Sequence, residues 1–95
     1  MTSSEAYKQT LTLTNTHGIH VRTAALIAEC CGAYDAEITI TSPHASSDGK
    51  DMMRLLLLQA TCGTELLIES SGKDADQVMK ELCDLIQNKF KLMDD

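Results

Sequence analysis

Two hydrophobic periods alternate along the chain, and this alternation constrains the fold more than any other feature of the sequence. Residues 7–14, 36–41 and 64–70 alternate apolar with polar side chains, as strands with one buried face do. Residues 21–31 instead repeat apolar side chains every three or four positions, which is the period of an amphipathic helix. The sequence therefore predicts a mixture of strands and helices.

Turn-forming residues indicate where these segments end and add two short elements. Gly32 is expected to end the first helix. The turn-rich stretch 42–49 contains the only proline and is predicted to bend back into a short third strand. Asp51 then begins a short apolar helix over residues 52–58.

The last segment predicts a long amphipathic helix, in which Asp74 and Gln77 stand three residues apart, as the two members of a capping box do. The predicted order is βαββαβα. It favours an α+β fold, an open-faced two-layer sandwich with a four-stranded antiparallel sheet and helices on one face. The buried stripe of the last helix is predicted to be Val78, Leu82, Leu85 and Ile86. The solvent face of the sheet is predicted to include Thr12, Thr39, Glu65 and Glu69.

The composition is that of one small globular domain spanning residues 1–95. Of the 95 residues, 43% are hydrophobic and 23% are charged, but only 3% are aromatic, so aliphatic side chains must form the core. A chain of this length has little room for a large substrate cavity together with a cofactor domain. A carrier, adaptor or binding module is therefore favoured over a multi-step enzyme.

The charge distribution argues against nucleic-acid and membrane partners. Eight Lys and Arg against fourteen Asp and Glu give a net charge of −6, and the basic residues form no stripe that could neutralise phosphates. The longest apolar run, Leu55–Leu58, is far shorter than the ~20 residues needed to span a bilayer. The polar opening segment MTSSEAYKQT lacks a hydrophobic signal core, so a cytoplasmic protein is expected.

Cysteine usage agrees with a reducing compartment. Cys30, Cys31, Cys62 and Cys83 include no CxxC pair, and no histidine stands at zinc-site spacing. We expect reduced, partly buried thiols that pack as small core residues, with no structural metal site.

The segment most suited to chemistry is the strand-to-helix turn GIHVR at residues 18–22. His20 falls at the start of the helix, near the unpaired N–H groups of Val21, Arg22 and Thr23. These donors and the helix dipole favour an anion, and Arg22 adds a fork of donors. A neutral imidazole is a competent nucleophile, so the pattern suits a phosphoryl group on His20. A capping or solvated histidine would give the same pattern.

The run GIHVRTAA resembles the active-site segment of the HPr family, the histidine-containing phosphocarriers of the bacterial phosphoenolpyruvate:sugar phosphotransferase system. The family pattern there is Gly-Leu-His-x-Arg-Pro-Ala. The similarity continues through AEITIT, GKD and CGTELLIESSGKDADQV, and covers essentially the whole chain. The family also has the βαββαβα order, so the resemblance implies an HPr-like sandwich.

The resemblance implies a role for each residue of the motif. His20 would be phosphorylated on Nδ1, and Arg22 would stabilise the phosphate. The protein would accept the phosphoryl group from enzyme I and pass it to an enzyme II A domain or a regulatory acceptor. It would act as a monomer and would need no metal or organic cofactor. The word "carrier" would describe it better than "enzyme" because no free substrate is turned over.

Two positions depart from the pattern of the family. Thr23 stands where the family usually has proline, either as a tolerated change or as one that loosens the first turn and alters transfer. Asp51 matches a regulatory serine found in relatives from many Gram-positive bacteria. We expect Asp51 to cap the short helix, worth about 1 kcal/mol. The alternative is that its charge partly imitates phosphoserine and disfavours docking to enzyme I.

The short helix is expected to dock partners, since in the family its start lies beside the active histidine. Met52, Met53 and Leu56 would form an adaptable apolar patch there, with core packing as the alternative. Lys50 and Arg54 could add charge at the rim of this patch.

Phosphoryl transfer through His20 is the leading hypothesis. The alternative is an HPr-like regulatory module, nitrogen-type or carbon-regulatory, that acts by docking with little phosphotransfer. A generic ligand-binding domain would need a sizeable pocket, and nothing in the sequence requires one. His17 and His44 are expected to be loop residues outside the chemistry. The sequence does not identify the acceptor.

Overall fold

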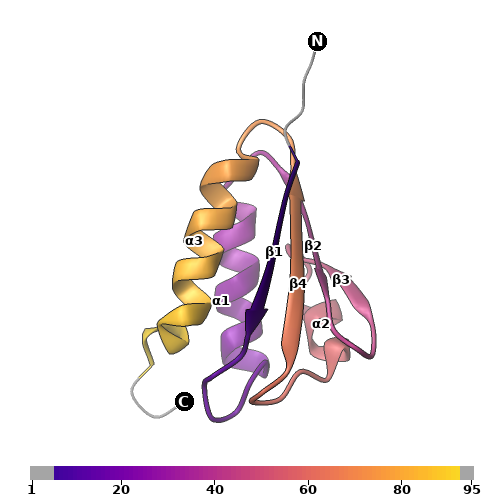
Figure 1. Cartoon of the computed structure of the whole chain (residues 1–95), viewed down its shortest axis with the longest axis vertical. Helices are drawn as coiled ribbons and strands as arrows, with labels where there is room; N and C mark the ends of the chain where they lie inside the picture. Colours follow the sequence, from indigo (N-terminus) through magenta and orange to yellow (C-terminus); the bar gives the residue numbers. More distant parts are fainter. Residues whose placement is uncertain (1–5, 93–95) are drawn as a thin grey trace.

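A four-stranded antiparallel sheet with two long helices on one face forms the framework of the protein, in a computed structural model that describes residues 6–92 (Figure 1). The strands are β1 (Ala6–Thr12), β2 (Glu37–Thr41), β3 (Ser46–Asp48) and β4 (Glu65–Ser71), in the spatial order β1-β4-β2-β3. The helices are α1 (Val21–Gly32), α2 (Met52–Leu55) and α3 (Ala75–Gln87), with 3₁₀ turns η1 (Leu56–Leu58) and η2 (Lys89–Lys91). This order confirms the predicted βαββαβα fold.

The core lies between the sheet and the helices. Leu11 on β1 stands opposite Leu66 on β4, and Ile68 on β4 stands opposite Ile40 on β2. Because side chains alternate along a strand, these residues all face the helices. The helices contribute matching apolar stripes, so the faces predicted from the sequence are confirmed. The buried helical side chains include Ala24, Ile27, Cys31, Val78, Leu82 and Ile86, whereas Leu85 is only half-buried.

The other face of the sheet carries polar side chains. Thr12, Thr39 and Glu65 are exposed and Glu69 is half-buried, as predicted. Lys8 lies directly opposite Glu69 and forms an ion pair with it at 3.8 Å. Exposed ion pairs of this kind contribute little to stability, so the sheet is held mainly by its apolar face.

The segment predicted as one short helix over 52–58 is divided in two. After the four residues of α2 the chain tightens into η1, and Gln59 then adopts a left-handed conformation with φ of 52°. In a 3₁₀ turn, residues three apart lie above one another. This tightening directs both Leu55 and Leu58 into the core, which a regular α-helix would do less well.

The C-terminal end of α1 and the N-terminal end of α3 differ from the caps predicted from the sequence. Gly32 is the last residue of α1, but Ala33 is the cap and no left-handed glycine is involved. The capping box predicted for Asp74 is wrong. Asp74 has φ of −104° and ψ of 22°, and its carboxylate makes no bond to α3. It accepts a hydrogen bond from the backbone N–H of Asp35 at 2.8 Å, which fastens the α1–β2 connection to α3.

Within residues 6–92, no helix has the length and apolar character needed to cross a bilayer.

Candidate functional site

Two loops meet at the end of the sheet where β1 finishes and β4 begins (Figure 1). The backbone N–H of Leu13 donates to the carbonyl oxygen of Thr64 at 2.9 Å, and that of Gly63 donates to the carbonyl of Leu13 at 2.8 Å. Further along the first loop, Ile19 donates to the carbonyl of Ala60 at 2.8 Å. The loop that leads into α1 is therefore fixed to the turn that leads into β4.

Gly18 is required by the close approach of these two loops. Its φ is +61°, a conformation that costs non-glycine residues energy. A Cβ atom built on Gly18 would lie 2.2 Å from the carbonyl oxygen of Ala60 and 2.7 Å from the Cα of Thr61. The sequence-based expectation of a tight turn at this glycine is confirmed, and the neighbouring backbone explains why no side chain fits.

Asn15 stabilises the same turn through hydrogen bonds to Gly18. This residue was not identified from the sequence. Its side chain is fully buried, and its Nδ2 donates to the carbonyl of Gly18 at 2.8 Å. The backbone N–H of Gly18 donates back to the carbonyl of Asn15 at 3.3 Å, which closes a four-residue turn. Asparagine at the first position of a β-turn is a common signal, so the pattern Asn-x-x-Gly could have revealed this role.

His20 is the N-cap of α1. Its backbone is extended, with φ of −137° and ψ of −170°, and its Nδ1 accepts a hydrogen bond from the backbone N–H of Arg22 at 3.3 Å. The ring is half-buried and so remains accessible to solvent. Because Nδ1 accepts a hydrogen bond, a neutral imidazole carries its proton on Nε2 and keeps a lone pair on Nδ1. This is the tautomer in which Nδ1 is the nucleophilic atom.

Thr23 completes a capping box with His20. The Thr23 hydroxyl is fully buried, accepts a hydrogen bond from the backbone N–H of His20 at 2.9 Å and donates to the carbonyl of Gly18 at 2.9 Å. The Thr23 hydroxyl thus ties the helix to the loop, which favours the interpretation of threonine as a tolerated change at this position. The Thr23 side chain therefore faces inward, and only its backbone N–H faces the His20 ring.

The start of α1 has the electrostatics of an anion site. The helix has twelve residues, and its first turn carries no acidic side chain, so no carboxylate occupies the positive end of the helix dipole. Arg22 is exposed, and among residues 6–92 its guanidinium forms no ion pair. An imidazole, backbone N–H donors and a guanidinium thus occur together at one helix start.

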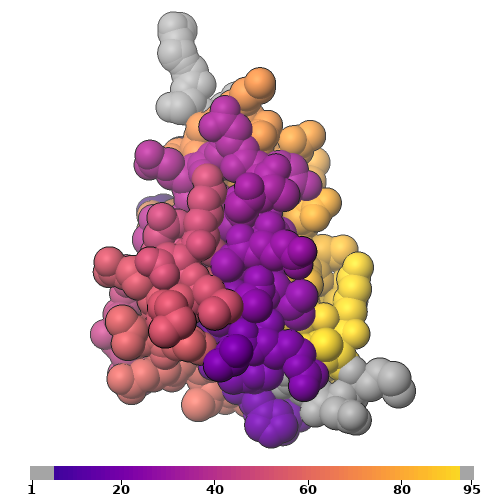
Figure 2. Space-filling model, turned by 180° about the vertical axis from the view of Figure 1, so that it is seen from behind, coloured from indigo at the N-terminus to yellow at the C-terminus, as the bar shows by residue number. Residues whose placement is uncertain are grey.

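Exposed apolar side chains lie beside this site. Among the described residues, the most exposed large hydrophobic side chains are Val21 at 63%, Met53 at 66% and Leu57 at 63%. They belong to the start of α1, to α2 and to η1, and α1 contacts α2 directly. Figure 2 shows these segments side by side on one face. We call Val21, Met53 and Leu57 the apolar patch.

The sequence located this patch only in part. Met53 is exposed as expected, but Met52 and Leu56 are half-buried and pack against the core. Val21 was identified for its backbone, and Leu57 was not identified. The division between α2 and η1 explains the difference, since it changes which leucines face outward. Lys50 and Arg54 are exposed at the rim, as expected.

A family model described as the PTS HPr component phosphorylation site matches residues 7–88. The chain belongs to the HPr family. It is a phosphocarrier of the phosphotransferase system, as the resemblance of GIHVRTAA implied.

Known HPr proteins are similar along most of their length. The chain is 32% identical over 81 residues to the phosphocarrier protein HPr of Pseudomonas aeruginosa, which covers 84% of this chain and 90% of that protein. It is 31% identical over 80 residues to the phosphocarrier protein NPr of Shewanella violacea, with coverage of 84% and 88%. The crystal structure of HPr-C-His from Thermoanaerobacter tengcongensis matches with a TM-score of 0.87 and 25% identity, covering 92% of this chain and 98% of that one. The HPr-like fold is thereby confirmed.

Asp51 is the N-cap of α2. Its Oδ1 accepts a hydrogen bond from the backbone N–H of Arg54 at 3.2 Å. Its backbone is extended, as at most N-caps, with φ of −106° and ψ of 98°. The predicted capping role is confirmed, and one carboxylate oxygen is committed to it.

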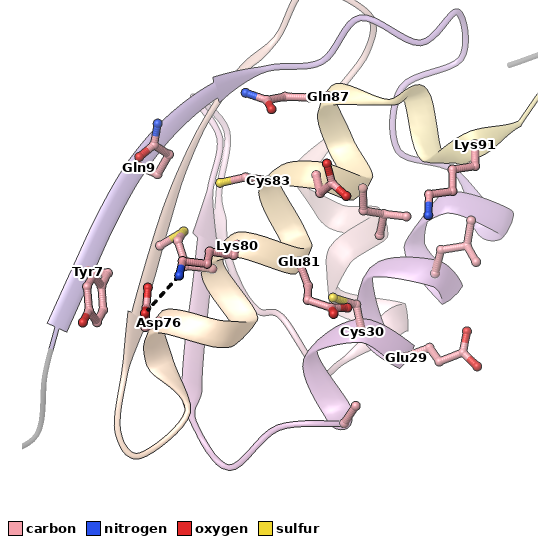
Figure 3. A pocket seen from close by; sticks show the side chains of 15 residues that line it. Tyr7, Gln9, Glu29, Cys30, Asp76, Lys80, Glu81, Cys83, Gln87 and Lys91 are labelled. Carbon is pink, nitrogen blue, oxygen red and sulfur yellow. Dashed lines mark ion pairs between the residues drawn. The ribbon is translucent and has the colours of Figure 1, made fainter.

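A hollow of about 1010 Å³ lies elsewhere on this HPr-family fold (Figure 3). Its walls come from both flanks of α3, with Tyr7 and Gln9 of β1 on one side and Cys30 of α1 on the other. An ion pair between Lys80 and Asp76 at 3.5 Å crosses its surface. Neither His20 nor Arg22 lines it, so this hollow and the candidate site are separate.

The four cysteines are free thiols in different environments. Burial raises the pKa of Cys31 to about 12, and burial, then Glu81 and Glu29, raise the pKa of Cys30 to about 11. Burial also raises the pKa of Cys83. Cys62 is exposed, contrary to the expectation that all four would be partly buried. Within residues 6–92, no cluster of three or more His, Cys, Asp or Glu side chains is placed to hold a metal ion.

Proposed function

We propose that this HPr-family protein carries its phosphoryl group on Nδ1 of His20. It takes the group from phospho-enzyme I and passes it to an enzyme II A domain or to a regulatory acceptor. The observation that carries this proposal is the position of Nδ1, which lies 3.3 Å from the backbone N–H of Arg22 at the start of α1. The imidazole is thus placed where the backbone already offers donors to an anion.

The proposed transfer is a nucleophilic displacement at phosphorus. The Nδ1 lone pair attacks the phosphorus, the bond between phosphorus and the donor breaks, and the electron pair of that bond returns to the donor. His20 then carries a nitrogen–phosphorus bond. The reverse sequence at an acceptor restores the free imidazole, so His20 is phosphorylated and regenerated in each cycle.

Backbone N–H groups at the start of α1 and the Arg22 guanidinium would hold the phosphoryl oxygens. The N–H groups of Arg22 and Thr23 face the His20 ring and would redirect from Nδ1 to the oxygens once Nδ1 is occupied. The dipole of α1 favours the same negative charge, and the first peptide unit of the helix, at Val21, adds another donor. The Arg22 guanidinium, which forms no ion pair within residues 6–92, would form charge-assisted hydrogen bonds with the phosphoryl oxygens.

The apolar patch is the surface we assign to partner docking. Met53 and Leu57 stand on the elements next to α1, while Val21 stands within the site. A partner that covers the patch would also cover His20, which excludes water during transfer. Met52 and Leu56 support the patch from below through their contacts with the core.

The wider setting follows from the family. We propose one carrier domain acting as a monomer in the cytoplasm, where phosphoenolpyruvate supplies the phosphoryl group to enzyme I. No metal or organic cofactor takes part in the proposed step at His20. The regulatory module remains the competing proposal, and it differs in requiring docking without significant phosphotransfer.

The deciding experiment is direct phosphorylation. The purified protein is incubated with enzyme I, phosphoenolpyruvate and Mg²⁺, and the intact mass is measured before and after acid treatment. We expect an acid-labile gain of one phosphate on the wild type and none on His20→Ala. If the wild type gains none while a control HPr does, the carrier proposal fails and the regulatory module is supported.

A further inference from the structure

The ring of His17 contacts the ring of His20. The two ring centroids are 5.9 Å apart, and the ring planes meet at 87°. Aromatic pairs favour this T-shaped arrangement because the positive edge of one ring meets the electron-rich face of the other. His17 is exposed. Burial in the core therefore does not explain why its ring lies against the imidazole of His20.

The backbone around His17 is fixed on both sides. Before it, the carbonyl of Asn15 accepts from Gly18 at 3.3 Å, and the Asn15 side chain donates to the carbonyl of Gly18 at 2.8 Å. After it, Ile19 donates to the carbonyl of Ala60 at 2.8 Å. The turn that presents His17 therefore has a fixed place relative to the start of α1.

We propose that His17 is a positioning residue for phosphoryl transfer, whose ring holds the imidazole of His20 in the orientation that directs Nδ1 toward the incoming phosphorus. This inference rests on the proposed role of His20. It assigns a function to a loop histidine that the sequence placed outside the chemistry.

The backbone N–H groups of Arg22 and Thr23 that face the His20 side chain act at one edge of its ring, and the contact with His17 adds a restraint on ring rotation. The second side-chain torsion of histidine is broad and roughly two-fold, so rotation about it is easy. The contact from Arg22 N–H to Nδ1, at 3.3 Å, is at the long end of the hydrogen-bond range. A ring packed at right angles to His20 restricts that rotation further. Removing it leaves Nδ1 correctly directed for a smaller fraction of the time.

The contact should affect the rate of transfer and leave docking unchanged. His17 lies in the loop before α1, whereas Met53 and Leu57 of the apolar patch come from α2 and η1. Loss of one aromatic pair corresponds to about a three- to tenfold change in the population of the aligned ring. The expected kinetic effect is therefore a lower kcat with an unchanged KM.

The test measures kcat and KM for phosphorylation of this protein by enzyme I and phosphoenolpyruvate. His17→Ala should lower kcat about three- to tenfold and leave KM within about twofold. His17→Phe keeps an aromatic edge and should restore kcat to within about twofold of the wild type. His44→Ala, which removes an exposed histidine from the β2–β3 hairpin, is the matched control and should change neither constant.

A spectroscopic measurement separates positioning from a general loss of structure. The ¹⁵N resonances of His20 should report one neutral tautomer, protonated at Nε2, in the wild type and in His17→Phe. In His17→Ala they should move toward an average of both tautomers, while the backbone amide spectrum stays folded.

Three results would overturn the inference. The first is a His17→Ala protein with the kcat of the wild type. The second is a raised KM with kcat preserved, which would make His17 a docking contact. The third is a His17→Phe protein as slow as His17→Ala. Failure of the proposed function looks different, because then the wild type itself gains no phosphate.

Discussion

The hydroxyl of Thr23 accepts a hydrogen bond from the backbone N–H of His20 at 2.9 Å. It also donates to the carbonyl of Gly18, so one buried side chain joins the helix start to the loop before it. Threonine at this position therefore replaces the rigid ring of the family's usual proline by two hydrogen bonds. The substitution that seemed to loosen the site instead braces it.

Removing this hydroxyl should lower stability. Thr23→Ala leaves the His20 N–H without its partner, and we expect the free energy of unfolding to fall by about 1–2 kcal/mol. Thr23→Ser keeps the hydroxyl and loses only a buried methyl group, so it should cost less, about 0.5–1 kcal/mol. Urea unfolding measures both. Equal stability of the alanine and serine variants would show that the capping box contributes nothing.

Gly18 and Gly63 offer a matched pair of glycines with positive φ. Gly18→Ala combines a strained φ with a Cβ only 2.2 Å from the Ala60 carbonyl oxygen, and we expect a loss of about 3 kcal/mol or more. Gly63→Ala has φ of +92° but no atom within 4 Å of the new Cβ, so only the smaller conformational cost of about 1–2 kcal/mol applies. Thermal unfolding of the two variants should give a clearly lower Tm for Gly18→Ala.

Polar substitution in the apolar patch should weaken docking and leave the fold intact. Met53→Ser and Leu57→Ser replace side chains that are 66% and 63% exposed, so stability should stay within about 0.5 kcal/mol. We expect the KM for enzyme I to rise about fivefold or more with kcat little changed, since buried apolar contacts dominate binding energy. Lys73→Ala, in the β4–α3 connection at the opposite end of the molecule (Figure 1), is the control. Its KM should match that of the wild type.

Two substitutions of Asp51 separate the effect of its capping hydrogen bond from the effect of its negative charge. Asp51→Ala loses the bond to the Arg54 N–H and should cost about 1 kcal/mol, whereas Asp51→Asn keeps a capping oxygen and removes only the charge. We expect Asp51→Asn to leave the free energy of unfolding unchanged. The KM for enzyme I should stay within about twofold of the wild-type value. A fall in KM well beyond that would favour the alternative, in which the carboxylate imitates phosphoserine and repels the donor.

The four thiols should differ sharply in reactivity. The thiolate is the reactive form, so a pKa raised to about 11 for Cys30 and about 12 for Cys31 leaves both protonated at pH 8. Cys83 is also held as the thiol by its raised pKa. Limited alkylation with iodoacetamide at pH 8, followed by peptide mass mapping, should find the label on exposed Cys62. Labelling of Cys31 before Cys62 would contradict the described burial.

The spacing of hydrophobic residues predicted the fold, because an element with one buried face repeats apolar residues at the period of a strand or of a helix. Leu11, Ile40 and Leu66 alternate with polar residues, and the helices repeat at their own spacing, so element type and order followed. The GIHVR run then placed His20 at a helix start. The structure confirms the position of His20 as the N-cap.

Features that depend on partners distant in the sequence could not be predicted in the same way. The carboxylate of Asp74 has the right spacing for a capping box, but the N–H of Asp35, 39 residues away, engages it instead. The outward direction of Leu57 depends on the tightening into η1, which the four consecutive leucines do not reveal. The contact between His17 and His20 required the turn geometry that Gly18 sets.

The donors that face His20 are peptide N–H groups of α1. Substituting the side chain of Val21 or Arg22 by anything except proline leaves these groups in place as long as the helix persists. On the proposed function, the chemistry of transfer depends on His20, Arg22 and the main-chain geometry of α1, whereas the choice of partner depends on replaceable surface residues such as Met53. A lineage could exchange one set of partners for another by surface mutation alone, with the phosphoryl station inherited intact.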